Sequence, residues 1–555
     1  RWWIERMVET LATGMREGAA SGLVAPFLWD DIPDVPDWRE RIIWPVSAAY
    51  SRTMGEAVCR EVIARTAAIS DAFDRQVAQV AAGLFVNGFV SLAEAAYVAQ
   101  SETLLGISVL GGPPELDALR DSDAAVNVMA HRHRGKGIFD VTPASYPLLR
   151  SVIRTASWTP PLMLAPALTA PSSTAISHNA LLRRYARQKG GRTRYWPAAN
   201  ILVSVRGREP EMVDQNAGRA VTRSMAEALL PHAEGLEEPW RSRVAALFEA
   251  RLTPSIAKIC ADVKAVRNTR RLATNLWTGT GAAYVARLIA SEVSRRGGVV
   301  TGFDHGGVTA ISQVLELTSI SELMVADRFC VATQPWARIL EQSKAMPLAS
   351  PFGGCEIIHS DGEPTFRQAC IDGTARTRRR VVYVGHPYRA LRQFAIAGTS
   401  DAIYWDLQSR LAAHLDGLAI DLTCKPHPEG HFVGKRNPIE KIATTSYRRF
   451  EEHLPDTDIF VFDAPTSTTF AEALCTNRRV VLIERGQYPF NPAIDAEVRA
   501  RCRIVPSRID ERNRIWPDLE ALDEAVLGGP ETVDPSFFRE LLAGKNQAFD
   551  NKVGI

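Results

Sequence analysis

The sequence lacks three features that would assign a class of protein directly. Its eight cysteines include no C-x-x-C pair, whereas zinc sites and disulfide frameworks normally use closer spacing. No uninterrupted apolar run reaches the ~18 residues that a membrane-spanning helix needs. The first ten residues carry Glu5 and Glu9 and no small-residue cleavage site, unlike a signal peptide. These absences favour a cytoplasmic protein with reduced cysteines and no metal site.

Lysine and net charge are also scarce. The 65 basic residues comprise 55 arginines and 10 lysines, and 63 acidic residues bring the net charge to +2. A nearly neutral chain without interleaved aromatic and basic residues is not typical of a nucleic-acid-binding protein. We therefore expect no nucleic-acid partner. The 555 residues are 46% hydrophobic and 23% charged, which is ordinary globular usage and leaves room for two to four domains.

The pattern of apolar residues predicts an α/β protein with added helices. Apolar residues recur at helical spacing near the N-terminus, and strand and helix patterns then alternate in two later stretches. The expected regions are a helical N-terminal region (1–105), a Rossmann-like domain (106–345), a linker (346–380), a second Rossmann-like domain (381–520) and a helical tail (521–555). The expected strands include 106–110, 199–205, 270–277, 298–307, 380–385, 418–424, 458–462, 479–483 and 502–505.

Three polar clusters follow expected strands, at the edge where open α/β sheets bind their ligands. They are D-H-G-G at 304–307, K-P-H-P-E-G at 425–430 and D-A-P-T-S-T-T-F-A-E-A at 463–473. In the first cluster, His305 is a candidate general base for a hydroxyl group. Gly306 and Gly307 would let a ligand approach the backbone closely.

The second and third clusters have the chemistry of a phosphate site. Lys425 and His427, held in an extended turn by the adjoining prolines, would neutralise phosphate charge. Hydroxyl and amide groups at a helix start also favour a phosphate, and the residues at that start are Ser467, Thr468 and Thr469. Each cluster has a simpler alternative: a structural histidine in a turn, a solvated lysine, or an ordinary N-cap serine with Glu472 in the first turn.

In this order, H-G-G, K-P-H-P and D-x-P-x-S-T-x-x-x-E-A resemble motifs of bacterial surface-polysaccharide transferases with the GT-B fold. This group includes CDP-glycerol glycerophosphotransferases, bacterial sialyltransferases and the Kdo transferases of capsule synthesis. The resemblance covers about residues 270–510 and implies two facing Rossmann-like domains.

The resemblance also implies roles for individual residues. It assigns His305 as the base and His427 as a second catalytic residue, and it places Lys425, His427, Ser467, Thr468 and Thr469 at the nucleotide phosphate. The further candidates for the cleft are Gly306, Gly307, His386, Glu429, Asp463 and Glu472.

The function that the resemblance implies is glycosyl transfer from a CMP-activated sugar, with Kdo or another nonulosonic acid favoured. The acceptor would be a hydroxyl of a glycan or glycolipid, and no cofactor or metal is expected beyond the nucleotide-sugar cosubstrate. Two alternatives remain: transfer of a polyol phosphate from a CDP-alcohol, and a nucleotide-sugar-binding protein without activity.

Three other motifs carry weaker signals. The basic residues at 183–194 and the H-R-H-R-G-K run at 131–136 indicate either a solvated face or contact with an anionic glycan or the inner face of the plasma membrane. T-G-T-G at 278–281 lacks the remaining residues of a nucleotide-binding loop, and its turn is a candidate to line the acceptor side.

Overall fold

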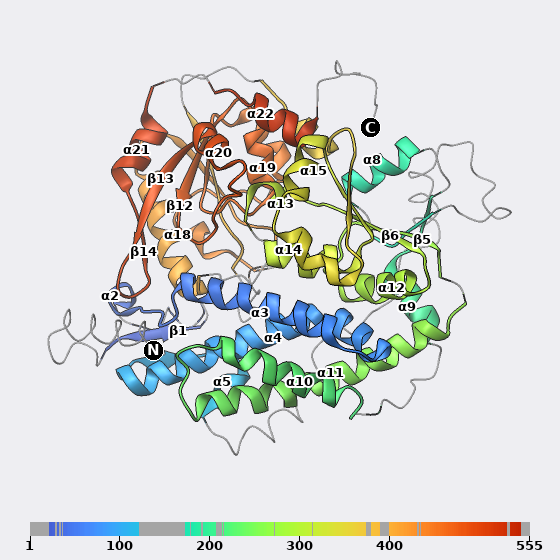
Figure 1. Cartoon of the computed structure of the whole chain (residues 1–555). Helices are drawn as coiled ribbons and strands as arrows, with labels where there is room; N and C mark the ends of the chain where they lie inside the picture. Colours follow the sequence, from blue (N-terminus) through green and yellow to red (C-terminus); the bar gives the residue numbers. More distant parts are fainter. Residues whose placement is uncertain are drawn as a thin grey trace.

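The computed structural model describes residues 22–120, 173–529 and 533–544, apart from short gaps at 28–29, 31, 33–34, 36, 178, 190–192, 207–213, 215, 271, 314, 373–378, 389–398, 430–431 and 433–434. Two six-stranded sheets stand beside each other over a layer of long helices (Figure 1). The protein is therefore α/β, as the sequence predicts.

The first sheet is entirely parallel and has the order β4-β3-β5-β6-β7-β8. Its strands are β3 (Ser173–Ala175), β4 (Thr193–Tyr195), β5 (Asn275–Thr278), β6 (Val299–Phe303), β7 (Arg328–Val331) and β8 (Glu356–His359). The helices associated with it are α8 (Ala180–Lys189), α9 (Ala198–Arg206), α12 (Tyr284–Arg295), α13 (Val308–Ile311), α14 (Leu315–Ser321), α15 (Gln334–Glu341), α16 (Ala345–Ala349) and α17 (Pro364–Ala369).

The second sheet has the order β10-β9-β11-β12-β13-β14, and only its last strand is antiparallel. Its strands are β9 (Arg380–Val384), β10 (Asp421–Lys425), β11 (Ile459–Phe462), β12 (Arg479–Glu484), β13 (Cys502–Ile509) and β14 (Ile515–Pro517). The helices associated with it are α18 (Asp401–Asp416), α19 (Thr468–Leu474), α20 (Asp495–Arg501), α21 (Leu519–Leu527) and α22 (Ser536–Phe538). Numbered along the chain, the six parallel strands of the first sheet follow the order 2-1-3-4-5-6, and the five parallel strands of the second sheet follow the order 2-1-3-4-5.

The helical layer is built around α4 (Ala72–Leu105). This helix is long and apolar enough to cross a membrane, but 72% of its most apolar window is buried inside the protein. The helices α3 (Ala48–Ala68), α5 (Pro114–Arg120), α11 (Trp240–Asn268) and α12 contact it, and α10 (Arg219–Leu229) completes the layer. A helix that is apolar on all sides needs such cover to fold in water.

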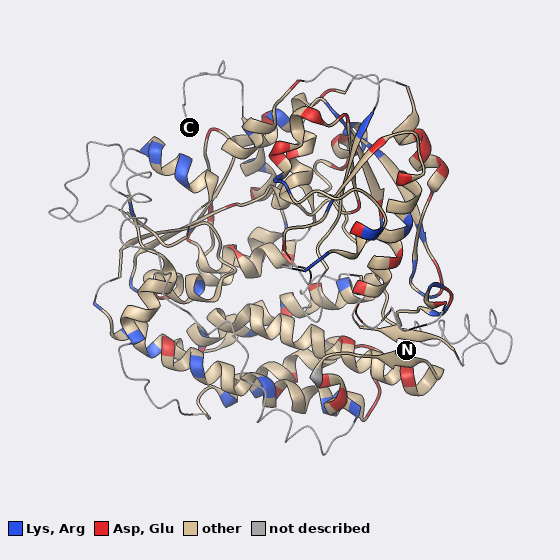
Figure 2. Cartoon of the chain, turned by 180° about the vertical axis from the view of Figure 1, so that it is seen from behind, with Lys and Arg blue, Asp and Glu red and all other residues tan. Residues whose placement is uncertain are grey.

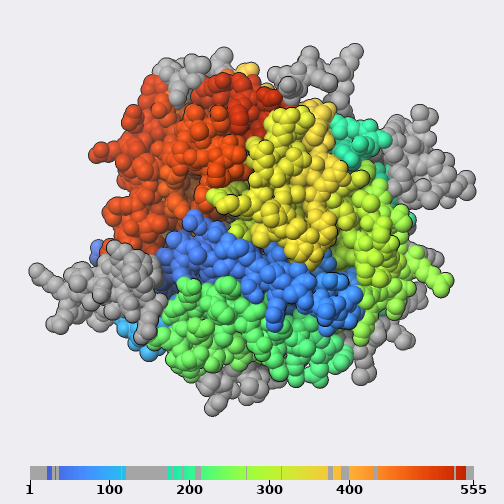
Figure 3. Space-filling model, in the orientation of Figure 1, coloured from blue at the N-terminus to red at the C-terminus, as the bar shows by residue number. Residues whose placement is uncertain are grey.

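The N-terminal segment contacts the parts of the chain that carry each sheet. On the first-sheet side, Arg60 of α3 forms an ion pair of 2.7 Å with Glu316 of α14. On the second-sheet side, the Trp44 backbone is hydrogen-bonded to Arg512 and Asn513, which lie between β13 and β14. Figure 3 shows α3 lying against both portions on the face of the molecule that it presents.

Several elements differ from the sequence-based expectations. Residues 199–205, expected as a strand, lie in α9, because a short apolar run fits a half-buried helix as well as a strand. In the run 106–110, only Ser108–Leu110 forms a strand, β2, and it pairs with β1 (Val24–Pro26) instead of joining the first sheet.

The interval 346–380, expected as a linker, also contains regular structure. It holds β8 and α17, and β8 is the edge strand of the first sheet. In the 521–555 tail, α21 contacts β12 and β13 of the second sheet. The short helical turns at 536–543 reach the first-sheet portion, where Thr333 and Glu363 bond the backbone of residues 541–542. The eight cysteines are all described and form no disulfide bond, and all except Cys370 are buried.

A buried carboxylate links the helical layer to the first sheet. Asp262 of α11 accepts two hydrogen bonds from Arg206 of α9, at 2.8 and 2.7 Å, and one from the Tyr284 hydroxyl of α12 at 2.5 Å. Its side chain is buried, whereas that of Arg206 is partly exposed. The Asp262 carboxylate and its two donors therefore hold α9, α11 and α12 together at one point.

We predict that Asp262→Ala lowers the stability of the fold by about 2–3 kcal/mol, because it leaves a guanidinium and a hydroxyl without their acceptor. Differential scanning calorimetry would measure this as a lower Tm. Tyr284→Phe is the matched control, and we expect a smaller loss of about 1 kcal/mol because the carboxylate of Asp262 and its bonds to Arg206 remain. An unchanged Tm for Asp262→Ala would contradict the prediction.

Candidate functional site

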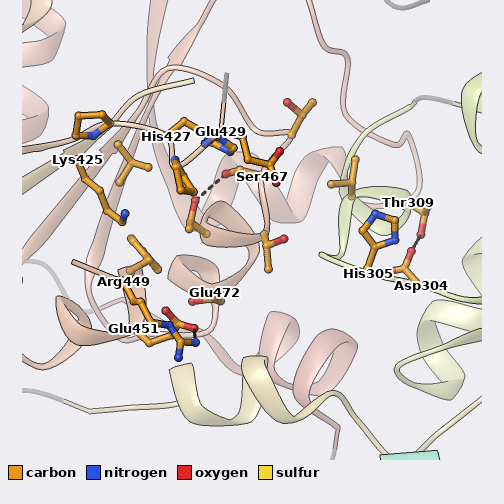
Figure 4. Close-up of a pocket in the computed structure, with 18 of the residues that line it drawn as sticks. Asp304, His305, Thr309, Lys425, His427, Glu429, Arg449, Glu451, Ser467 and Glu472 are labelled. Atoms are coloured by element: carbon orange, nitrogen blue, oxygen red, sulfur yellow. Dashed lines mark hydrogen bonds and ion pairs between the residues drawn. The ribbon is translucent and has the colours of Figure 1, made fainter. Parts of the chain in front are cut away.

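A cavity of about 690 Å³ lies where the carboxyl ends of the two sheets meet. Its lining comes from the turns after β6, β10 and β11, together with residues 447–451 and the end of α14. Figure 4 shows the Lys425–Glu429 turn and Ser467 on one side of the cavity and the Asp304–Thr309 turn on the other. All three polar clusters that the sequence places after strands therefore reach one cavity.

The first-sheet turn touches α19 of the second portion directly. Gly306 has a φ of +89°, and a Cβ atom there would lie 2.4 Å from the Thr468 hydroxyl oxygen. Gly307 has a φ of +75°, and its Cβ would lie 3.0 Å from Phe366 and 3.1 Å from Ala471. The two glycines bring the two parts of the chain into contact, a different role from the ligand approach that the sequence suggests.

Lys425 ends β10 with its side chain almost buried, 6% exposed. Among the described residues, none forms an ion pair or hydrogen bond with its ammonium group. Burial lowers the pKa of Lys425, although Glu451 and Glu472 act in the opposite direction. A buried ammonium without a direct counter-ion weakens the fold, and an anion in the cavity would neutralise it.

His427 projects from the same turn and is half-buried. Its Nδ1 accepts a hydrogen bond of 3.1 Å from the backbone N–H of Glu429, so the proton of the neutral ring lies on Nε2. Burial lowers the pKa of His427, and this effect is larger than that of Glu429, which raises it. The ring is therefore a neutral N–H donor at the cavity.

The hydroxyl groups before α19 are already engaged. Ser467 is the N-cap, accepting a hydrogen bond of 3.1 Å from Phe470 N–H, and its oxygen lies 2.9 Å from that of Thr469. The capping alternative is thus confirmed for Ser467. Glu472, one turn later, is buried at the cavity, and burial raises the pKa of its carboxyl to about 9.

The opposite wall carries Asp304 and His305. Asp304 is buried and accepts hydrogen bonds from the Thr309 hydroxyl at 2.7 Å and from Gly307 N–H at 3.2 Å. Burial raises the pKa of this carboxyl. His305 is exposed, and no hydrogen bond to its ring exists among the described residues. Neighbouring residues here point in different directions, so no Asp–His pair forms (Figure 4).

Two predicted cleft residues, His386 and Asp463, lie outside the lining of this cavity. Asp463 accepts hydrogen bonds from Tyr383 and Tyr404 at 2.6 and 2.8 Å, and His386 N–H donates to Tyr404. They form a cluster at the ends of β9 and β11, in which Asp463 is buried and His386 half-buried. Glu429 does line the cavity.

Sequence reasoning missed two features of the cavity. One is the pair Arg449–Glu451, 2.5 Å apart, in a segment without regular strand or helix signals. The other is Glu322, a buried carboxyl that follows α14 and lines the first-sheet wall. Neither feature follows an expected strand, and the other site residues were found because they do. The sequence therefore gave no indication of these two.

Within the described ranges, no three His, Cys, Asp or Glu side chains are grouped closely enough to hold a metal ion. Comparison of the chain with family models, with curated proteins and with solved structures returned no match.

We predict that Gly306→Ala destabilises the protein more than Gly297→Ala does. Both positions have positive φ, but a Cβ at 297 meets nothing within 4 Å, so this control carries only the backbone strain of about 1–2 kcal/mol. The difference in Tm between the variants measures the contact with α19. Adding Thr468→Ala to Gly306→Ala should recover part of the lost Tm, because it removes the hydroxyl that the new Cβ meets. An equal fall in Tm for Gly306→Ala and Gly297→Ala would contradict a tight contact.

Proposed function

We propose that the protein transfers a group from a nucleotide-activated donor to a hydroxyl acceptor, with glycosyl transfer favoured. The observation that carries this proposal is Lys425, a nearly buried ammonium at the wall of a large cavity, with no direct counter-ion among the residues that the structure describes. A phosphate of the donor supplies the missing negative charge.

The residues beside Lys425 suit a departing phosphate. Lys425 offers a positive charge and His427 an N–H group, both placed by one proline-containing turn. As the bond to the transferred group breaks, negative charge grows on the phosphate oxygen, and fixed donors in a partly closed cavity stabilise it more than water does. The rigid turn lets this happen without rearrangement of the protein.

The fold also supports transfer from a nucleotide-activated donor. Two sheets whose parallel strands begin with the same order, 2-1-3-4-5, present their carboxyl ends to one cavity, and such edges are where open α/β sheets bind ligands. We therefore propose a GT-B-like arrangement of two facing Rossmann-like domains. The second would hold the donor and the first the acceptor.

The choice of donor rests on the motif resemblance. H-G-G, K-P-H-P and the Ser-Thr motif all reach the cavity, which agrees with the roles that the resemblance implies. We propose a CMP-activated donor, Kdo or another nonulosonic acid, and a hydroxyl of a surface glycan or glycolipid as acceptor. Transfer of a polyol phosphate from a CDP-alcohol could use the same phosphate site; the product of that reaction is a new phosphodiester, which product analysis detects.

The acceptor side has a basic element beside it. Arg183, Arg187 and Lys189 are exposed on α8, where Figure 2 shows basic residues concentrated. We propose that this helix faces an anionic acceptor or the inner face of the plasma membrane. Residues 131–136, the second basic run, lie outside the described residues.

We predict that Lys425→Met abolishes nucleotide binding while making the free protein more stable. Burial lowers the pKa of Lys425, so the protonated ammonium weakens the folded state; this effect is greatest below the lowered pKa and disappears as pH rises past about 10.4. A thermal-shift panel of CMP, CDP, UDP, GDP and ADP at neutral pH measures both effects.

For the unaltered protein we expect the largest shift with cytidine nucleotides. A ligand at 100 times its Kd stabilises by ~2.7 kcal/mol. Lys264→Met, at an exposed lysine of α11, is the matched control and should keep the shift. No shift with any nucleotide would contradict the proposed function, and a shift that Lys425→Met retains would contradict the phosphate site.

A further inference from the structure

The first-sheet wall of the cavity carries a buried carboxyl that the proposed donor site does not use. Glu322 follows α14 and has only 7% of its surface exposed, and Lys425 belongs to the second-sheet wall. The role proposed for Glu322 rests on the proposed function, because it is a step of that reaction.

The T-G-T-G turn after β5 holds the Glu322 carboxylate in place. The backbone N–H of Gly281 donates to Oε2 at 2.7 Å, and the Thr280 hydroxyl donates to Oε1 at 3.3 Å. Gly281 is required for this contact, since a Cβ there would lie 2.5 Å from the backbone oxygen of Ser321. A motif that the sequence leaves as a weak nucleotide signal is instead a support for a carboxylate.

The charges around Glu322 do not neutralise it by direct contact. Arg287 of α12 is buried nearby, but its guanidinium donates to the backbone oxygens of Ile320 and Gln79, at 2.5 and 2.7 Å. His305 and Asp304 face it from the turn after β6 and act in opposite directions. Burial raises the pKa of Glu322 to about 7, so the carboxyl can gain and lose a proton near neutral pH.

We propose that Glu322 is the general base that accepts the proton of the acceptor hydroxyl. The hydroxyl oxygen forms a bond to the transferred carbon while the bond from that carbon to the donor phosphate oxygen breaks. The electron pair of the broken bond leaves with the phosphate, beside Lys425 and His427. The hydroxyl proton moves to the Glu322 carboxylate, which returns it to solvent after product release.

The alternative base, His305, is less well placed. Its ring is exposed and lacks a hydrogen bond within the described part of the chain, whereas a general base normally needs a fixed orientation. Glu322 has two donors that fix it and lies at the wall where the acceptor enters. His305 is thus a neighbour that lowers the pKa of the Glu322 carboxyl, against the effect of burial.

The test is the pH dependence of CMP release from CMP-N-acetylneuraminate, with glycerol as the hydroxyl acceptor. Glu322→Gln keeps an oxygen for Gly281 N–H but cannot accept the proton. We expect kcat to fall by about 100-fold or more, with an unchanged thermal shift by CMP. The unaltered protein should lose activity as the pH falls through about 7, and Glu322→Gln should lack this acidic limb.

His305→Ala is the comparison variant, and it should keep the acidic limb with a smaller loss of rate. Loss of the limb in His305→Ala together with its retention in Glu322→Gln would overturn the assignment. If Glu322→Gln does not fold, Thr280→Val removes one orienting donor and should lower kcat several-fold without changing the CMP shift; an unchanged kcat would overturn the assignment.

The proposed function and this step fail in different ways. Absence of both CMP binding and CMP release in the unaltered protein overturns the function, and the step with it. Binding and turnover that Glu322→Gln leaves unchanged overturn only the step.

Discussion

The contact between the Gly306–Gly307 turn and α19 is the constraint on which the site depends. A turn at the end of β6 can meet a helix that follows β11 only if no side chain stands between them. Because the two glycines remove that obstacle, the carboxyl edges of two separate sheets border one cavity. Each wall then contributes a different chemistry, which neither sheet could provide alone.

The two walls carry different ionisable groups. The wall from the second sheet carries Lys425, the neutral His427 and the buried carboxyl of Glu472, whereas that from the first sheet carries the buried carboxyls of Asp304 and Glu322. Burial raises the pKa of the three carboxyls and lowers that of Lys425. Each of these groups makes the empty protein less stable, which is the usual consequence of arranging charge for a ligand.

Local patterns in the sequence predicted much of the second sheet, because its buried strands are nearly continuous apolar runs ended by polar turns. They also predicted that Lys425, His427 and Ser467 share one edge of the second sheet, because each follows a strand. The nearness of His305 was implied only by the resemblance, through two facing domains. The same patterns could not show that 199–205 is helical or that β8 belongs to the first sheet. Both outcomes depend on which distant segments of the chain pack against these residues. Glu322 was missed because its position depends on a turn 41 residues earlier.

The N-terminal segment touches both sheet-bearing portions, through Arg60 on one side and Trp44 on the other. In many two-domain enzymes the domains swing apart on a hinge to exchange ligands. Here a third body is attached to both, so a wide opening would break contacts at each end of that segment. Exchange of any ligand of the cavity would then depend on small local movements of its wall, and the lifetime of the bound ligand would be set by how often those movements occur.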